Sequence, residues 1–207
     1  DATNGRPIKV FEGRFRGMSF SEDRRHILVW SGDDARVLDA GTGEQVGAEL
    51  KDVGRVSTAA FYADNRRVLL WGNGRVRLLV VATGDELVSF DVGSNVAPPI
   101  LFADESRILT WSREGEMRVW DAVTGTQIGP ALQHGVELRG ARVNAEGTRI
   151  LTWSEDGVAR FWSTAFSAQI GPTIADEGAL FLADGARILS WGVDGAHLFR
   201  ADTGAQI

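Results

Sequence analysis

The sequence of 207 residues contains no cysteine, which excludes disulfide bonds, thiolate zinc sites and cysteine nucleophiles together. A chain without cysteine fits a reducing compartment, and we expect a cytoplasmic protein. No apolar run approaches 18 residues, so the sequence predicts no membrane-spanning helix. The first residues also lack the basic segment followed by an apolar segment that is typical of a secretory signal.

Positive charge is scarce as well. Lys and Arg number 22 against 28 Asp and Glu, which gives a net charge of −6. This balance argues against broad binding to nucleic acids or anionic membranes, because no excess of positive charge is present to release counterions. Tyrosine occurs once and proline five times, whereas there are 25 glycines and seven tryptophans. Many glycines and regularly placed tryptophans indicate tight turns between packed strands.

The tryptophans reveal an internal repeat. Five of them each follow a short apolar run such as Arg149–Thr152, at spacings of 41, 40, 42 and 38 residues: Trp30, Trp71, Trp111, Trp153 and Trp191. The other two, Trp120 and Trp162, each lie nine residues after one of these, where the remaining repeats have Leu or Phe. A period of about 40 residues is typical of repeat architectures built from small, identical structural units.

Each repeat contains four short apolar runs separated by turns. The segment TRILTWSEDGVARFW has two such runs around Asp156-Gly157, a dipeptide that favours a tight hairpin. A further run precedes this hairpin and another follows a Thr-Gly turn. No stretch of 12 or more residues shows sustained helical spacing, so the sequence predicts an all-β protein.

Four strands in about 40 residues, with tryptophan ending the third strand in RVWDAVTG (Trp120-Asp121), resemble the WD-repeat family of β-propellers. The other repeats carry degenerate forms, and the TWSEDG wording resembles bacterial versions. This resemblance implies a propeller of about five blades of four antiparallel strands. It also implies a structural hydrogen-bonded set in one repeat, formed by His134, Thr152 or Ser154, Asp156 and Trp162.

The resemblance places the blades at about 14–50, 51–90, 91–132, 133–174 and 175–207, as a single propeller unit spanning 1–207. Residues 1–13 resemble 121–135, so we expect a strand at about 6–11 to complete the last blade and hide its edge. Two interpretations stay open: a closed ring of five blades, or part of a longer ring of about seven. The start without methionine favours the second, and an open ring is expected to self-associate through its edges.

The recurrence of five tryptophans at one strand position favours packing between adjacent blades over a ligand-binding aromatic cage. We therefore interpret Trp30, Trp71, Trp111, Trp153 and Trp191, and also Trp120, as structural residues.

The sequence offers no catalytic constellation. It lacks a Gly-x-Ser-x-Gly elbow and a phosphate loop, and its adjacent carboxylates, such as Glu155-Asp156, are typical turn formers. No histidine pair has the spacing of metal ligands. We therefore expect a protein that is not an enzyme and that carries no cofactor and no metal. One alternative is a remote resemblance of VLDAGTGEQVG to pyrroloquinoline-quinone dehydrogenases, although no docking tryptophan follows the Thr-Gly turns.

In the family, the connections from the fourth to the first strand and from the second to the third lie on one face. Function is expected there, because loops are free of the packing that fixes the strands. The candidate residues are Arg55, Asn95, Glu137 and Arg139 in the first set, and Asp34, Arg75, Arg113, Glu114 and Glu155 in the second. Four of these are arginines, which suggest a basic ring, and arginine is favoured at interfaces.

These observations predict a non-catalytic interaction scaffold that binds a protein partner through its loop face. An alternative is a sensor or regulatory segment of a larger bacterial signalling or defence protein, whose enzyme lies elsewhere. The expected partner is thus a protein or another domain of the same polypeptide, with no nucleic acid and no membrane.

Overall fold

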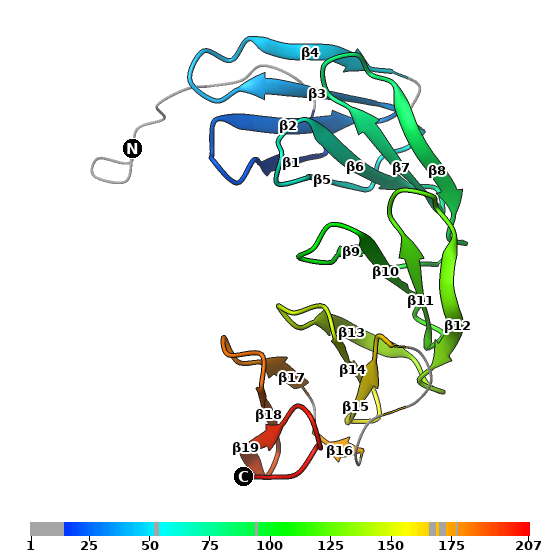
Figure 1. Ribbon diagram of the computed structural model, residues 1–207, viewed down its shortest axis with the longest axis vertical. Helices are drawn as coiled ribbons and strands as arrows, with labels where there is room; N and C mark the ends of the chain where they lie inside the picture. The colour runs from blue at the N-terminus through cyan, green and yellow to red at the C-terminus, as the bar shows by residue number, and fades with distance from the viewer. Residues whose placement is uncertain (1–14, 52–53, 94, 166–168, 170–172, 177) are drawn as a thin grey trace. The chain divides into compact units, whose positions relative to one another are not determined.

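A computed structural model describes residues 15–51, 54–93, 95–165, 169, 173–176 and 178–207. All the regular structure in these ranges consists of β-strands, as the sequence predicts. The chain divides into two compact units, Asp1–Val92 and Gly93–Ile207. Each unit is a row of antiparallel sheets, and each is described by itself below (Figure 1).

The first unit contains two four-stranded sheets, in which the strands are neighbours in the order of the sequence. The first sheet consists of β1 (Gly17–Phe20), β2 (His26–Ser31), β3 (Asp34–Asp39) and β4 (Gln45–Leu50). The second sheet consists of β5 (Thr58–Phe61), β6 (Arg67–Gly72), β7 (Arg75–Val80) and β8 (Glu86–Asp91).

The second unit contains three sheets with the same sequential order. The third sheet consists of β9 (Ile100–Leu101), β10 (Arg107–Trp111), β11 (Glu116–Asp121) and β12 (Gln127–Gln133). The fourth consists of β13 (Leu138–Val143), β14 (Arg149–Ser154), β15 (Val158–Ser163) and β16 (Ile174–Ala175). The fifth has three strands, β17 (Gly178–Phe181), β18 (Arg187–Gly192) and β19 (Gly195–Arg200).

The strand proposed at residues 6–11, within the segment 1–13, lies outside the described residues. At the end of the chain, Gln206 forms an isolated bridge with Phe199. The equivalent Gln45 and Gln127 pair with Leu38 and Trp120 where β4 and β12 begin. The chain therefore turns back along β19 in the same way as it does along the third strand of those sheets.

The hairpin turns follow the predicted chemistry. In the β6–β7 turn, Asn73 and Gly74 have φ values of 50° and 72°. Positive φ at both central residues is the requirement of a type I′ turn, which glycine and asparagine tolerate. In the fourth sheet Gly157 likewise has a φ of 73°. These turns fix the register, so that Trp71 lies opposite Val76 and Trp153 opposite Ala159.

The hydrophobic cores lie between neighbouring sheets. In the first unit, Leu28 and Trp30 of the first sheet pack with Ala59, Leu70 and Leu79 of the second. In the second unit one core joins the third and fourth sheets, and another joins the fourth and fifth. Because side chains alternate along a strand, each inner sheet buries both of its faces, which explains the nearly continuous apolar runs of the central strands.

Glycine lets the tryptophan indole lie across the first strand of its own sheet. Gly17, Gly140 and Gly178 lie beside Trp30, Trp153 and Trp191, respectively. A Cβ atom at these glycines would lie 2.3, 2.0 and 2.5 Å from the indole Cζ2. Any larger residue would force the ring to move away from the strand.

The five repeated tryptophans are not equally covered. Trp30 is 6 % exposed, and Trp111 and Trp153 are partly buried against the cores that join their sheets to the next. Trp71 is also partly buried, and its indole N–H forms no hydrogen bond with the described residues. Trp191 departs from the expectation of burial between blades, since it is 44 % exposed. The physical reason is that the fifth sheet is the last described one, and no later sheet covers its outer face.

Candidate functional site

The predicted structural set is assembled in the fourth sheet. Trp162 Nε1 donates to Thr152 Oγ1 at 2.9 Å, and His134 Nδ1 lies 2.8 Å from the same hydroxyl. His134 Nε2 lies 2.9 Å from Ser154 Oγ, which donates in turn to the Asp156 carboxylate. The sequence left Thr152 and Ser154 as alternatives, and the structure uses both hydroxyls.

The partners assign a direction to this chain of hydrogen bonds. Ser154 Oγ donates to a carboxylate and therefore accepts from His134, so Nε2 carries the proton. Nδ1 is then the acceptor of the Thr152 hydroxyl, which itself accepts from the Trp162 indole. The result is a neutral imidazole within a fully paired and buried polar chain, which rigidifies the corner of the sheet.

Electrostatics keep this imidazole neutral. His134 is 3 % exposed, and burial, aided by the positive charge of Arg160, lowers its pKa to about 4. The Asp156 carboxylate acts in the opposite direction and has the smaller effect. The guanidinium of Arg160 also donates to the backbone carbonyl of His134. His134 is thus a structural residue at neutral pH and is too buried to serve as a proton donor to a ligand.

Two related polar sets escaped the sequence analysis. In the third sheet, Trp120 Nε1 donates to Thr110 Oγ1 at 2.7 Å without any histidine. In the fifth sheet, Ser190 Oγ donates to the buried Asp176 carboxylate, and His197 Nδ1 lies 3.2 Å from the same oxygen. Thr110 was detectable, because it precedes Trp111 as Thr152 precedes Trp153. Asp176 was not, because it lies 14 residues before Ser190, whereas His134 lies 18 before Thr152.

The antiparallel order places the β2–β3 and β4–β5 connections, and their equivalents, at one edge of each unit, here called the loop edge. In the second unit this edge is held together by backbone hydrogen bonds between connections. Leu138 N donates to Arg113 O at 3.0 Å, and Glu155 N donates to Glu137 O at 3.1 Å. The predicted residues of the third and fourth sheets are therefore brought together.

Side-chain pairing balances the charges on this edge. Arg139 forms an ion pair with Glu155 at 3.6 Å, and Asn95 Nδ2 donates to Glu114 Oε1 at 3.2 Å. Arg113 is exposed and forms no ion pair with the described residues. The second-unit edge is thus a surface of mixed charge, with a single unpaired guanidinium among the candidates.

The first unit holds the remaining arginine candidates. Arg75 forms a two-point ion pair with Asp91, with Nε–Oδ1 and Nη2–Oδ2 distances of 2.9 and 3.3 Å. This contact lowers the pKa of Asp91 and raises that of Arg75. Arg55 is exposed, and its backbone carbonyl lies against Gly72, where a Cβ atom would be 1.7 Å from the oxygen. Asp34 begins β3 and is partly buried. Two of the four arginines predicted to form a basic ring are therefore neutralised by carboxylates.

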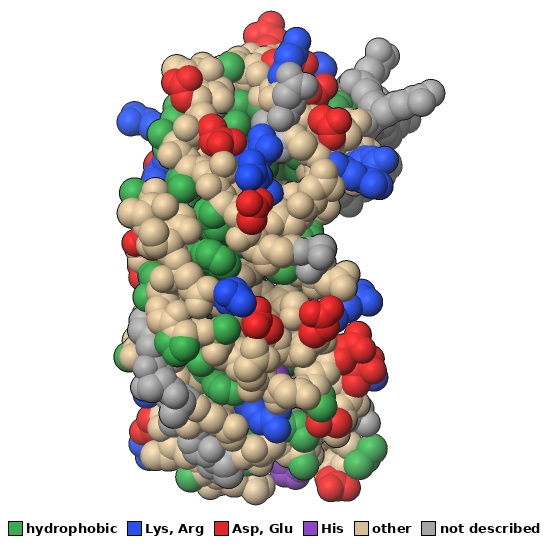
Figure 2. All heavy atoms as spheres, turned by 90° about the vertical axis from the view of Figure 1, so that its right-hand side faces the viewer, with side chains coloured by type: hydrophobic (Ala, Val, Ile, Leu, Met, Phe, Trp, Pro, Cys, Tyr) green, Lys and Arg blue, Asp and Glu red, His purple; other side chains and the backbone are tan. Residues whose placement is uncertain are grey.

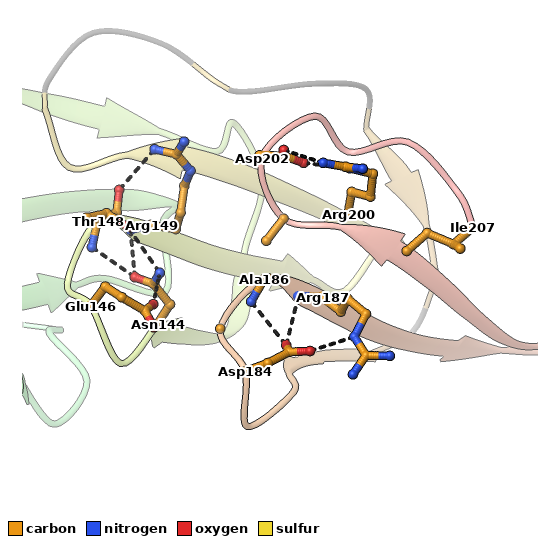
Figure 3. Close-up of a pocket in the computed structure, with 12 residues that line it drawn as sticks. Asn144, Glu146, Thr148, Arg149, Asp184, Ala186, Arg187, Arg200, Asp202 and Ile207 are labelled. Carbon is orange, nitrogen blue, oxygen red and sulfur yellow. Dashed lines mark hydrogen bonds and ion pairs between the residues drawn. The ribbon is translucent and has the colours of Figure 1, made fainter.

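A pocket of about 490 Å³ lies at the opposite edge of the second unit, where the sequence offered no candidate. It is formed by the β13–β14 and β17–β18 turns and by the segment that follows β19 (Figure 3). Arg187 pairs with Asp184 at 2.6 Å, and Arg200 pairs with Asp202 at 2.8 Å, which lowers the pKa of Asp202 to about 2. Arg149 donates to the Thr148 carbonyl at 3.3 Å and forms no ion pair with the described residues. Three arginines and three carboxylates (with Glu146) line the pocket, so it has no net charge.

The visible surface agrees with this balance: basic and acidic side chains are interspersed on the face drawn in Figure 2. Among the described residues, no group of three or more His, Cys, Asp or Glu side chains is placed to hold a metal ion. The described part of the chain also contains no long apolar helix that would cross a membrane.

Comparison with known proteins supports the fold. No protein-family model matches the chain, and no curated protein sequence matches it. Among solved structures, the chain is similar to the C-terminal WD40 domain of Sif2, with a TM-score of 0.68 and 15 % sequence identity. The match covers 93 % of this chain and 56 % of that chain, so this chain spans little more than half of the WD40 structure.

At this level of identity the likeness concerns the fold alone. Five antiparallel sheets in sequential order, with cores between neighbours and a WD40 structure as a match over nearly the whole chain, confirm the predicted fold class. The protein has an all-β, WD40-like propeller fold of about five blades.

Proposed function

We propose that this protein is a non-catalytic interaction module that binds a protein partner through the loop edge of its second unit. The carrying observation is the pair of backbone hydrogen bonds that tie Arg113 to Leu138 and Glu137 to Glu155. They hold exposed charged side chains from two sheets on one preorganised surface. A preorganised surface loses little conformational entropy on binding, which favours affinity.

The chemistry of this edge suggests the partner. Arg113, Glu114 and Glu137 are exposed, and Val136 among them is 39 % exposed. An apolar side chain surrounded by charges of both signs is typical of a protein interface, with a small desolvated centre and a polar rim. Nucleic acid is a poor fit, because the net charge is −6 and the carboxylates would repel phosphates.

Charge reversal at this edge tests the proposal. The immobilised wild-type chain is compared in pull-down with an Arg113→Glu/Arg139→Glu double variant and with an Arg66→Glu control. Arg66 is exposed on the turn before β6, at the other edge of its sheet. We expect a captured protein whose binding falls at least tenfold in the double variant and is unchanged in the control. Equal capture by all three chains would show that this edge is not the binding surface.

A second proposal keeps the surface but changes the partner to another domain of one longer bacterial signalling or defence polypeptide. Its support is the resemblance of the TWSEDG wording to bacterial repeats. Sequencing the reading frame tests it directly, since a stop codon immediately after Ile207 would exclude a following domain. Cytoplasmic localisation stays a prediction from the lack of cysteine.

A further inference from the structure

The outer face of the fifth sheet is built like an interface that has lost its cover. We call it the terminal face and define it by the side chains that share the side of Trp191: Leu180, Leu189, Trp191, Ala196 and Leu198. Their counterparts in the fourth sheet are covered by the fifth: Leu151 and Ala159 are 0 % exposed and Phe161 is 1 % exposed. In the fifth sheet, Trp191 is 44 % and Leu180 37 % exposed, Ala196 is exposed and Leu198 is half-buried.

The terminal face is also more apolar than its counterpart. In the fourth sheet, Arg142 lies over the Trp153 ring, with its guanidinium carbon 5.6 Å from the ring centroid. The equivalent position beside Trp191 is Leu180, because Arg142 pairs with Leu151 and Leu180 with Leu189. Replacement of a charged side chain by leucine raises the free energy of leaving this face in water.

The first sheet exposes the complementary kind of surface. Met18 and Phe20 on β1 are 59 % and 56 % exposed, and they pair with Val29 and Ile27 on the same side of the sheet. We call this side the opening face. The equivalent residues of the second sheet are Ala59, which is 7 % exposed, and Phe61, and both pack into the core that contains Trp30. Met18 and Phe20 therefore occupy the positions that elsewhere lie against the tryptophan-bearing face of a preceding sheet.

We propose that the partner of the terminal face is a second copy of this chain, bound head to tail through its opening face. Each exposed face is one half of the interface that joins the first sheet to the second and the fourth to the fifth. A second copy supplies the missing half of each, and the thioether of Met18 is well suited to contact the indole of Trp191. Such a contact is heterologous, so it extends into rings or filaments of copies.

The proposal predicts a mass that rises with protein concentration. Sedimentation of the 207-residue chain is expected to show multiples of 22.4 kDa at high concentration. Trp191→Glu and Met18→Glu are each expected to give a monomer when studied alone. Val123→Glu is the matched control, because Val123 is 66 % exposed in the β11–β12 turn and lies on neither face. It is expected to associate like the wild type.

Mixing the two variants gives the decisive result. Trp191→Glu keeps an intact opening face and Met18→Glu keeps an intact terminal face, so an equimolar mixture is expected to form a dimer that cannot grow further. Circular dichroism of each variant checks that the strands are retained. The proposal fails if the wild type is a monomer at all concentrations, as it would be if the two faces of one chain covered each other. It also fails if Met18→Glu alone still dimerises, since two terminal faces would then be meeting each other.

Discussion

The fourth and fifth sheets are built from nearly the same strand sequences, RILTW and RILSW, yet they differ in both of their environments. The fourth is covered on both faces and carries the His134 chain of hydrogen bonds. The fifth is covered on one face, leaves Trp191 exposed and replaces histidine by the Asp176 carboxylate. The difference shows that the strand sequence sets the position of each side chain, whereas the neighbouring sheet sets its environment.

The two polar sets also share a principle. In both sheets a strand hydroxyl, Thr152 or Ser190, is buried and lies directly across from a polar residue on the next strand, Arg160 or His197. A buried hydroxyl destabilises the fold unless it is paired. One sheet pairs it with an imidazole and the other with a carboxylate, so either group serves at this corner.

The largest expected effect is at the covered indole. Trp162→Ala removes a side chain that is 6 % exposed and leaves the Thr152 hydroxyl without its N–H donor. We expect the free energy of unfolding to fall by about 3–5 kcal/mol, as measured by urea denaturation. Trp191→Ala, measured at low protein concentration, is the matched control from the fifth sheet. Because Trp191 is 44 % exposed, its loss is expected to be half as large or smaller, and equal losses would contradict the comparison.

The next effect is a dependence on pH that only the fourth sheet has. Burial lowers the pKa of His134 to about 4 from an ordinary value of 6.5. Between pH 6.5 and 4 the unfolded chain binds a proton that the folded chain does not, so stability falls as the pH decreases through this window. Above pH 6.5 both states are neutral, and below about 4 both are protonated.

The expected loss over this window is up to roughly 3 kcal/mol. It is measured by urea denaturation at several pH values, with His134→Gln as the reference variant. The wild type is expected to lose more stability than the variant between pH 6.5 and 4. The carboxylates whose pKa values are lowered, such as Asp202, titrate below this window and are common to both chains. Parallel curves for the two chains would mean that His134 is not held neutral.

The smallest of the three effects is expected at the fifth sheet. Asp176→Ala removes the acceptor of the Ser190 hydroxyl, which is completely buried, and the partner of His197. We expect a loss of about 1–3 kcal/mol, because the hydroxyl keeps its desolvation penalty without a partner. The double variant Asp176→Ala/Ser190→Ala is expected to recover part of that loss. A double variant that is less stable than Asp176→Ala would show that Ser190 has another role.

Much of the fold was predictable because the repeat is written in local patterns. The tryptophan period, the Asp-Gly and Asn-Gly turns and the alternating apolar runs each act within a few residues, and they predicted sheets of short antiparallel strands. The His134 set was predictable for a related reason, because one repeat retains all of its residues. The pairing of Arg75 with Asp91 was not, because the two residues are 16 positions apart and meet only when β7 and β8 align.

The sequence by itself determined the strands, their turns and the side of each sheet on which every apolar residue lies, because these depend on backbone sterics and a two-residue alternation. The tertiary structure alone decided which of those sides are covered, which charges are neutralised and which histidine is held neutral. Burial and ion pairing depend on what lies opposite in space, and identical tetrapeptides carry no information about that neighbour. Trp153 and Trp191 have almost the same local sequence, and only the presence or absence of a following sheet separates a core residue from an exposed one.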